Sequence, residues 1–278
     1  MTIKQAQEEG GKRLQAAGIE EATFETTLIL EESVGMGRAE MLAHPETELA
    51  DKQEERFLAL VKSRESRIPL AYLLGRQEFM GLTFAVSPGV LIPRADTETL
   101  VEEVLRHLLD GMRILDLCTG SGCIALSLLH YSNGTTALAT DISEDALAVA
   151  ADNATALGLG DRFTTIRTDL WPDTAERFDL ITANPPYIET AVLEGLQPEV
   201  RDREPRIALD GGEDGLRFYR RIVSEAPAHL CADGWLFTEI GFDQGERVRQ
   251  LFVSAGFHEV SVIRDLGGND RVVKGCWF

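Results

Sequence analysis

Basic residues are scarce in this chain relative to acidic ones. Its 278 residues include 27 Lys and Arg against 46 Asp and Glu, which gives a formal net charge of -19. A protein that holds a nucleic-acid backbone usually neutralises several phosphates with Lys and Arg. The balance therefore disfavours a direct nucleic-acid substrate and suits a basic protein partner better, because opposite charges steer association.

Cysteines and long apolar runs are also scarce. The chain has no Cys-x-x-Cys pair, no His cluster at metal-ligand spacing and no run that approaches membrane-spanning length. The first eleven residues carry Gln and Glu in place of an apolar stretch. We therefore expect reduced, mostly buried thiols, no bound metal, no membrane contact and a cytoplasmic location, with a monomer as the default. The four cysteines are Cys118, Cys123, Cys231 and Cys276.

The first part of the chain, residues 1–74, is poor in strand formers and shows helical spacing of its apolar residues. It predicts a small domain of four or five helices. Short apolar runs on both sides of Gly81 predict a β-hairpin that ends near Pro88 and Gly89, within a linker over residues 75–94. The remaining residues, 95–278, are numerous enough to bury an ordinary core of their own.

Beyond the linker, short apolar strands alternate with helical segments, a pattern typical of a parallel sheet covered on both faces. A helix is expected to begin near Thr97, with its apolar stripe reaching Leu109. Strands are predicted at 114–117, 137–140, 163–167, 178–183, 235–240, 260–264 and 272–277, and helices at 123–130, 144–157, 216–230 and 245–255. Only residues 265–271, which include Gly267, Gly268, Asn269 and Asp270, separate the last two strands, so that pair must be an antiparallel hairpin.

A glycine-containing loop, residues 118–122, follows the first of these strands and leads into a helix. Gly120 and Gly122 have no side chains, so a ligand can lie close to the backbone at the carboxyl end of the strand. Asp141, at the end of the next strand, lies roughly 20 residues after Gly120. This is the spacing expected of a carboxylate that binds ribose hydroxyls. These features predict a nucleoside cofactor, and they fit NAD as well as S-adenosylmethionine.

The third strand is expected to end at Asp169. The two residues that follow it, Leu170 and Trp171, are placed to accept from an adenine amino group and to flank the adenine ring, respectively.

The fourth strand is followed by Asn184, Pro185, Pro186 and Tyr187 at the edge of the sheet where ligands bind in this architecture. An amide or exocyclic amino nitrogen is a poor nucleophile because its lone pair is delocalised. The Asn184 side-chain oxygen and the Pro185 carbonyl can each accept a hydrogen bond from such an NH2 group and aim its lone pair at a sulfonium methyl. Tyr187 can form an apolar wall. The structural alternative is a Pro-Pro turn in which Asn184 satisfies local backbone groups.

No strong base is required for this chemistry, because the nitrogen becomes acidic once it is alkylated. We therefore predict no catalytic histidine among the five that the chain contains.

Taken together, these motifs resemble those of the bacterial peptide-chain release factor glutamine methyltransferases. The resemblance covers nearly the whole chain and rests on the segments EFMGLTFAVSPGVLIPRADTETLVE, ILDLCTGSGCIAL, ATDIS, NPPYI and ALDGGEDGLRFYRRI. It implies a seven-stranded Rossmann-like α/β sheet of class I methyltransferase type with an antiparallel last strand, preceded by an all-helical substrate-recognition domain and a hairpin linker. It also implies methyl transfer from S-adenosylmethionine to the glutamine N5 atom in the Gly-Gly-Gln motif of class 1 release factors.

The resemblance assigns site residues by their match to the family's motifs. The expected cofactor-binding residues are Cys118, Thr119, Gly120, Ser121, Gly122, Asp141, Asp169, Leu170 and Asn184. The expected substrate-binding residues are Asn184, Pro185, Pro186 and Tyr187, of which Asn184, Pro185 and Tyr187 are the expected catalytic residues.

Some positions leave alternatives open. Cys118 occupies a position that is usually glycine in the family. Arg94 and Glu98 either line the site or form a salt-bridged linker and helix start. The acidic residues from Glu194 to Glu204 form either a docking surface or a solvated loop, and most charge runs are solvated.

Other functions share part of this pattern. A ribosomal-protein glutamine methyltransferase has the same fold and Asn-Pro-Pro-Tyr site, although the LIPRADTE segment favours the release-factor branch. An adenine-N6 nucleic-acid methyltransferase must also activate a poorly nucleophilic NH2 group, but the net charge of -19 disfavours a nucleic-acid substrate. A nicotinamide-dependent oxidoreductase leaves the Asn-Pro-Pro-Tyr segment unexplained. The remaining alternative is a module that binds the cofactor without turnover.

Overall fold

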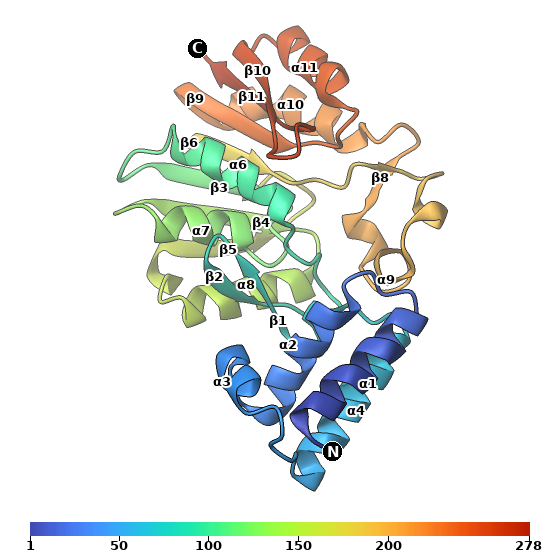
Figure 1. Ribbon diagram of the computed structural model, residues 1–278. Coiled ribbons are helices and arrows are strands. Elements are labelled where there is room, and N and C mark those ends of the chain that lie inside the picture. Colours follow the sequence, from blue (N-terminus) through green and yellow to red (C-terminus); the bar gives the residue numbers. More distant parts are fainter. The chain divides into compact units, whose positions relative to one another are not determined.

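The protein, described here by a computed structural model of all 278 residues (Figure 1), divides into two compact units. The helical unit comprises Met1–Gly75 together with Gln197–Arg203, and the sheet unit comprises Arg76–Leu196 and Glu204–Phe278. No helix in either unit is both long enough and apolar enough to cross a membrane.

Residues 1–75 of the helical unit form five helices, within the predicted four or five. They are α1 (Ile3–Ala16), α2 (Ala22–Val34), α3 (Arg38–Ala43), α4 (Asp51–Glu65) and α5 (Leu70–Leu74). Thr2 caps α1 by accepting from the Gln5 backbone N–H, while the Gln5 side chain accepts from the Thr2 backbone N–H. Gly10 allows α1 to approach α2 and α4 closely, since a Cβ on it would lie 2.6 Å from Thr26 Cγ2 and 2.9 Å from the Phe57 ring.

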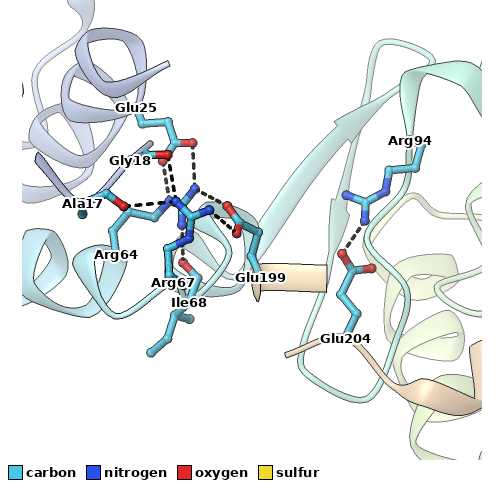
Figure 2. Close-up of polar contacts among 9 residues, drawn as sticks. All are labelled: Ala17, Gly18, Glu25, Arg64, Arg67, Ile68, Arg94, Glu199 and Glu204. Atoms are coloured by element: carbon cyan, nitrogen blue, oxygen red, sulfur yellow. Dashed lines mark hydrogen bonds and ion pairs between the residues drawn. The ribbon is translucent and has the colours of Figure 1, made fainter. Parts of the chain in front are cut away.

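An ion-pair cluster binds the short helix α9 (Pro198–Arg201) to the rest of the helical unit (Figure 2). Arg64 is 4% exposed and donates to Glu25 Oε1 at 3.2 Å and to Glu199 Oε1 at 3.1 Å. Arg67 pairs with the other oxygen of Glu199 at 3.0 Å and donates to the Gly18 carbonyl at 2.9 Å. Glu199 is therefore not part of a solvated acidic loop.

Replacing Glu199 with Gln should loosen the segment 197–203 without unfolding the helical unit, because Arg64 keeps its second carboxylate partner, Glu25. Loss of one charge-assisted contact should lower hydrogen-exchange protection of the segment's amides by about tenfold. The matched control is Asp202→Asn, since the Asp202 pair with Arg201 is solvent-exposed and such pairs contribute little. Equal exchange in the two variants would contradict the role assigned to Glu199.

The sheet unit is built on a seven-stranded sheet with the order β10-β11-β9-β6-β3-β4-β5. Its strands are β3 (Arg113–Leu117), β4 (Thr136–Asp141), β5 (Phe163–Arg167), β6 (Phe178–Ala183), β9 (Leu230–Glu239), β10 (His258–Arg264) and β11 (Asp270–Trp277). The pairs β9-β6, β6-β3, β3-β4 and β4-β5 are parallel, whereas β11 runs antiparallel to both β9 and β10. The predicted sheet and its antiparallel last strand are confirmed.

Helices cover both faces of this sheet (Figure 1). They are α6 (Ala95–Leu105), α7 (Cys123–His130), α8 (Glu144–Ala156), α10 (Arg217–His229) and α11 (Gly245–Ser254). Neighbouring residues of β3 point to opposite faces: Ile114 joins the apolar cluster with α6, α7 and α8, and Leu115 joins the cluster with α10 and α11. The helix α6 is shorter than predicted, because it ends at Leu105 and leaves Leu109 largely exposed.

The predicted hairpin is formed by β1 (Arg76–Phe79) and β2 (Leu82–Ala85) and belongs to the sheet unit. Glu98 accepts from the Met80 backbone N–H at 2.7 Å at the hairpin turn. Glu98 could either line the site or belong to the linker and helix start, and its bond to the hairpin turn supports the second alternative. Asn153 of α8 donates to the carbonyls of Ala85 and Ser121, which ties the hairpin to the glycine-containing loop.

The chain after β6 contains small elements that the apolar pattern does not predict. They are β7 (Ile188–Glu189), β8 (Asp210–Gly212) and the 3-10 turns η2 (Leu193–Gly195) and η3 (Arg206–Ala208), while a further turn, η1 (Gly160–Arg162), precedes β5. The strands β7 and β8 pair in parallel immediately after Tyr187. They fix the turn that follows the main sheet.

Candidate active site

A pocket lies within the sheet unit at the carboxyl ends of β3, β4, β5 and β6. Its walls include the segments 89–94, 118–121, 141–143 and 168–170, together with Thr97, Asn184, Pro186, Pro205, Ile207 and Ala208. The predicted site residues that line it are Cys118, Thr119, Gly120, Ser121, Asp141, Asp169, Leu170, Asn184 and Pro186, whereas Gly122, Pro185 and Tyr187 do not. No histidine lines it.

A fully buried carboxyl group, that of Asp116 in β3, holds the loop that follows this strand. Asp116 accepts from the Thr119 hydroxyl at 2.6 Å and from the Thr182 hydroxyl at 2.7 Å. Burial raises the pKa of Asp116 to about 6, and the two hydroxyl donors partly oppose that shift. Asp116 thus joins the glycine-containing loop to β6, the strand that leads to Asn184.

Gly120 and Asp141 face each other across this loop. The Gly120 backbone N–H donates to Asp141 Oδ2 at 3.0 Å, and the Ser143 N–H donates to Oδ1 at 2.9 Å. Gly120 has φ 55°, and a Cβ on it would meet no atom within 4 Å, so its side-chain direction is open space. The Ser121 hydroxyl nearby is buried without a hydrogen-bond partner. The loop therefore offers open space and an unpartnered polar group beside a carboxylate.

Gly122, predicted to contact a cofactor, serves helix packing. A Cβ on it would lie 3.0 Å from Leu126 Cδ1 of α7 and 3.2 Å from Ala150 Cβ of α8. The residue has φ 79°, a left-handed conformation that favours glycine. Its glycine is required by backbone conformation and by the contact between two helices, so the prediction of a cofactor contact is not supported.

The end of β5 agrees with the strand predicted at 163–167 but not with the expectation that this strand ends at Asp169. The strand ends at Arg167, and the largely exposed Asp169 pairs with Arg221 at 3.1 Å. Leu170 is buried, and its carbonyl accepts from the Thr140 hydroxyl at 2.8 Å. Trp171 does not line the pocket, because its ring stacks on His229 with centroids 4.4 Å apart.

The apolar residue that lines the pocket beside the predicted ribose carboxylate is Ile142, which directly follows Asp141 and is 46% exposed. The position after a strand-ending carboxylate is the sequence signal that would have identified it.

Behind Asn184, several polar side chains meet in the interior. Asn184 Nδ2 donates to the Thr97 hydroxyl over 3.5 Å, a long hydrogen bond. The Tyr187 hydroxyl donates to Glu239 Oε1 at 3.3 Å, and burial raises the pKa of Tyr187. Tyr187 does not line the pocket, and its role as an apolar wall for the acceptor stays a prediction. Thr97 and Glu239 were not predicted, although Glu239 stands at the carboxyl end of a predicted strand.

Arg94 lines the pocket and forms an ion pair with Glu204 (Figure 2). The Glu204 side chain is almost fully buried, and only one of its two oxygens has a partner. The two alternatives for Arg94 were a residue that lines the site and a residue in a salt-bridged linker. Arg94 fits both, because it lines the pocket and is paired with Glu204. Glu204, like Glu199, is not a solvated acidic residue.

Comparison with known proteins identifies the family. A model described as the PrmC N-terminal domain matches residues 5–75, and one described as the methyltransferase small domain matches residues 84–196. The release factor glutamine methyltransferase of Moorella thermoacetica is 46% identical over 98% of this chain and 97% of that protein. The one from Geobacter sulfurreducens is 44% identical over 94% and 92%. The chain belongs to the release factor glutamine methyltransferase family.

Solved structures agree on the fold of this family member. A methyltransferase from Pyrococcus furiosus has a TM-score of 0.54 and covers 77% of this chain and 98% of its own. Its sequence identity is 16%, so the likeness is one of fold alone.

Two features of this family member concern the backbone of the site. Cys118 has φ 57°, a left-handed conformation that disfavours any residue with a Cβ. Burial, reinforced by Asp141 and Asp116, raises the pKa of its thiol, which therefore stays neutral.

Gly211 lies against the backbone after Asn184: a Cβ on it would be 2.7 Å from Tyr187 Cα and 2.9 Å from the Pro186 carbonyl oxygen.

Replacing Cys118 with Gly, the residue usual in the family, should be tolerated. Relief of the left-handed strain is offset by the greater freedom of glycine in the unfolded chain, so the free energy of unfolding should stay within about 1 kcal/mol of wild type. Cys118→Val, which adds β-branching at the same φ, should lose at least about 1 kcal/mol and weaken cofactor binding. Urea denaturation and calorimetric titration with S-adenosylmethionine measure both effects, and a stable, tightly binding Val variant would contradict this account.

Replacing Gly211 with Ala should displace the turn that carries Pro186 and Tyr187, because the atoms in the way belong to the backbone. We expect at least about tenfold lower turnover and a loss of roughly 1–3 kcal/mol in unfolding free energy. Gly195→Ala is the matched control, since a Cβ there meets no atom within 4 Å. If both variants turned over at the wild-type rate, the contact would have no functional consequence.

Proposed function

We propose that this protein transfers the methyl group of S-adenosylmethionine to the side-chain amide nitrogen of the glutamine in the Gly-Gly-Gln motif of class 1 peptide-chain release factors. The observation that carries the proposal is the position of Asn184. It lines the pocket that also contains Gly120 and Asp141, and its Nδ2 is bonded to Thr97. Full-length relatives at 44% and 46% identity are named release factor glutamine methyltransferases.

The residues of the pocket suit S-adenosylmethionine. The open space at Gly120 leaves room for a ligand against the backbone. Asp141 receives one backbone N–H on each carboxylate oxygen and keeps lone pairs for ribose hydroxyls. The unpartnered Ser121 hydroxyl supplies a further polar contact, and Ile142 an apolar one. When bound, the cofactor supplies an electrophilic methyl group on a sulfonium sulfur.

The protein's own contribution is to position the acceptor. Asn184 Oδ1 and the Pro185 carbonyl accept hydrogen bonds from the glutamine NH2 group and direct the nitrogen lone pair toward the methyl carbon. Transfer of the methyl group to this nitrogen would leave the cofactor as a neutral thioether, and the surplus proton on the nitrogen would pass to solvent. Tyr187 holds the turn through the hydrogen bond from its hydroxyl to Glu239.

The remaining parts have complementary roles in this proposal. Residues 1–74 recognise the protein substrate, residues 75–94 link them to the catalytic part, and residues 95–278 hold the cofactor and the glutamine. The net charge of -19 supports a partner that presents basic residues.

Transfer of labelled methyl groups tests the substrate. The protein should label an intact class 1 release factor and should leave unlabelled the release factor with the motif glutamine replaced by Ala, ribosomal protein and duplex DNA. Label in ribosomal protein would identify the protein as the other type of glutamine methyltransferase. Label in DNA, or label that survives the Gln-to-Ala change, would overturn the proposal.

Asn184→Ala should lower kcat on the release factor by about 10²- to 10³-fold, because it removes an acceptor that positions the reacting nitrogen. The dissociation constant for S-adenosylmethionine, measured by calorimetry, should remain within a few-fold of wild type. Near-normal turnover in this variant would disprove the role of Asn184.

A further inference from the structure

The proposed methyl transfer does not use Arg94, although this residue ends the segment 89–94 that lines the pocket. The Arg94 carbonyl accepts from the Thr97 backbone N–H at 3.0 Å, and the Thr97 hydroxyl accepts from Asn184 Nδ2 over 3.5 Å. Arg94 is therefore linked through Thr97 to the residue proposed to orient the glutamine. It belongs to the acceptor end of the pocket.

A buried carboxyl group holds the Arg94 guanidinium (Figure 2). The Glu204 side chain is 1% exposed; its Oε1 accepts from Arg94 Nη2, whereas its Oε2 has no partner. Burial raises the pKa of Glu204, and the ion pair with Arg94 opposes that rise. Burying a carboxyl group with so few partners destabilises the fold. In return, Glu204 restrains a long side chain that would otherwise lose rotamer freedom on binding a ligand.

Glu204 leaves most of the hydrogen-bonding capacity of Arg94 unused. An arginine carries several N–H donors, and Glu204 is the only acceptor that the structure gives to this guanidinium. Arg221, which also lines the pocket, differs because its Nη1 and Nη2 both donate to Asp169 at 3.1 Å. The Arg94 side chain is 41% exposed, so its remaining donors are open to a ligand at the pocket.

The proposed substrate offers few groups for recognition next to its glutamine. The two glycines of a Gly-Gly-Gln motif carry no side chains, so only their backbone N–H and carbonyl groups can make polar contacts. A carbonyl that loses water on entering the pocket needs a donor in exchange. Asn184 Oδ1 and the Pro185 carbonyl are acceptors and cannot supply one.

We propose that Arg94, held in place by Glu204, donates to a main-chain carbonyl of the two glycines that precede the acceptor glutamine. Arg94 then determines specificity for the substrate backbone, and Glu204 is a positioning residue that acts through it. This role rests on the proposed function and adds to it the means by which the Gly-Gly part of the motif is recognised. The contact is distant from the reacting atoms and persists throughout methyl transfer, so it should affect KM more than kcat.

Steady-state kinetics of the intact protein with a class 1 release factor test this role. Arg94→Met keeps an apolar stem but removes the donors, and it should raise KM about tenfold, the equivalent of one hydrogen bond. The kcat and the dissociation constant for S-adenosylmethionine should stay within about twofold of wild type. The matched control is Arg220→Met, which breaks the pair with Asp214 outside this pocket and should leave KM unchanged. An unchanged KM in Arg94→Met, or cofactor binding weakened by about tenfold, would overturn the proposal.

Arg94→Met also leaves Glu204 without its partner, and further variants separate the two effects. Glu204→Gln should raise KM by about threefold, because Arg94 keeps its donors but loses its charged anchor. The double variant Arg94→Met/Glu204→Gln contains no unpaired carboxylate and should keep the rise of about tenfold. A double variant with the wild-type KM would trace the effect of Arg94→Met to the unpaired carboxylate and would contradict a contact with the substrate.

The carbonyl itself can be altered in a semisynthetic release factor. An ester in place of the amide that follows a motif glycine weakens the carbonyl of that glycine as an acceptor. At one of the two glycines, the ester should raise KM by about threefold for the wild type and by less for Arg94→Met, in which the contact is already lost. Equal rises for both enzymes at both glycines would rule out recognition of a glycine carbonyl by Arg94.

These measurements also separate the role of Arg94 from the proposed function. If the wild type methylates no release factor, the proposed function is wrong and the role of Arg94 is overturned with it. If the wild type methylates a release factor with a KM that does not depend on Arg94, the proposed function stands and only the role of Arg94 is wrong.

Discussion

One buried carboxyl group, Asp116, holds the two halves of the site in register. It binds Thr119 in the loop after β3 and Thr182 near the end of β6, so the loop proposed to hold the cofactor and the strand that carries Asn184 share one acceptor. Methyl transfer tolerates little error in the position of donor and acceptor. A parallel sheet brings the ends of its strands to a common edge. The distance between the loop after β3 and the end of β6 is fixed further by Asp116, because its carboxyl group is hydrogen-bonded to both.

The sequence predicts the sheet because its signals are local and periodic. Buried parallel strands are short apolar runs, and the five-residue link before β11, residues 265–269, leaves no room for a crossover. Asp141 and Asn184 could be predicted as pocket residues because each lies directly after such a run. Tyr187 and Trp171 could not be oriented, because that depends on partners 52 and 58 residues away, Glu239 and His229.

The acidic stretch before β8 shows why charge runs are poorly predicted from sequence alone. Three arginines, Arg201, Arg203 and Arg206, lie close to Glu199 and Glu204 in the sequence, so local spacing does not reveal the distant partners of these two glutamates. Their partners, Arg64 and Arg94, lie 135 and 110 residues earlier. The chain leaves the sheet unit after Leu196 and returns at Glu204, so one short segment belongs to the helical unit and the next residue to the pocket region. Local sequence spacing cannot reveal these distant partners.

Glu239 shows what a buried carboxyl group costs this fold. Its pKa of about 7 lies above the ordinary value, so its favourable contribution to stability is present in acid and is lost as the pH rises through about 7. The Tyr187 hydroxyl donates to one oxygen of Glu239, and the other oxygen has no hydrogen-bond partner. A neutral, apolar residue at this position would remove the cost of burying a carboxyl group, but it would leave the Tyr187 hydroxyl without its acceptor. The turn that follows β6 would then lose the contact that ties it to β9.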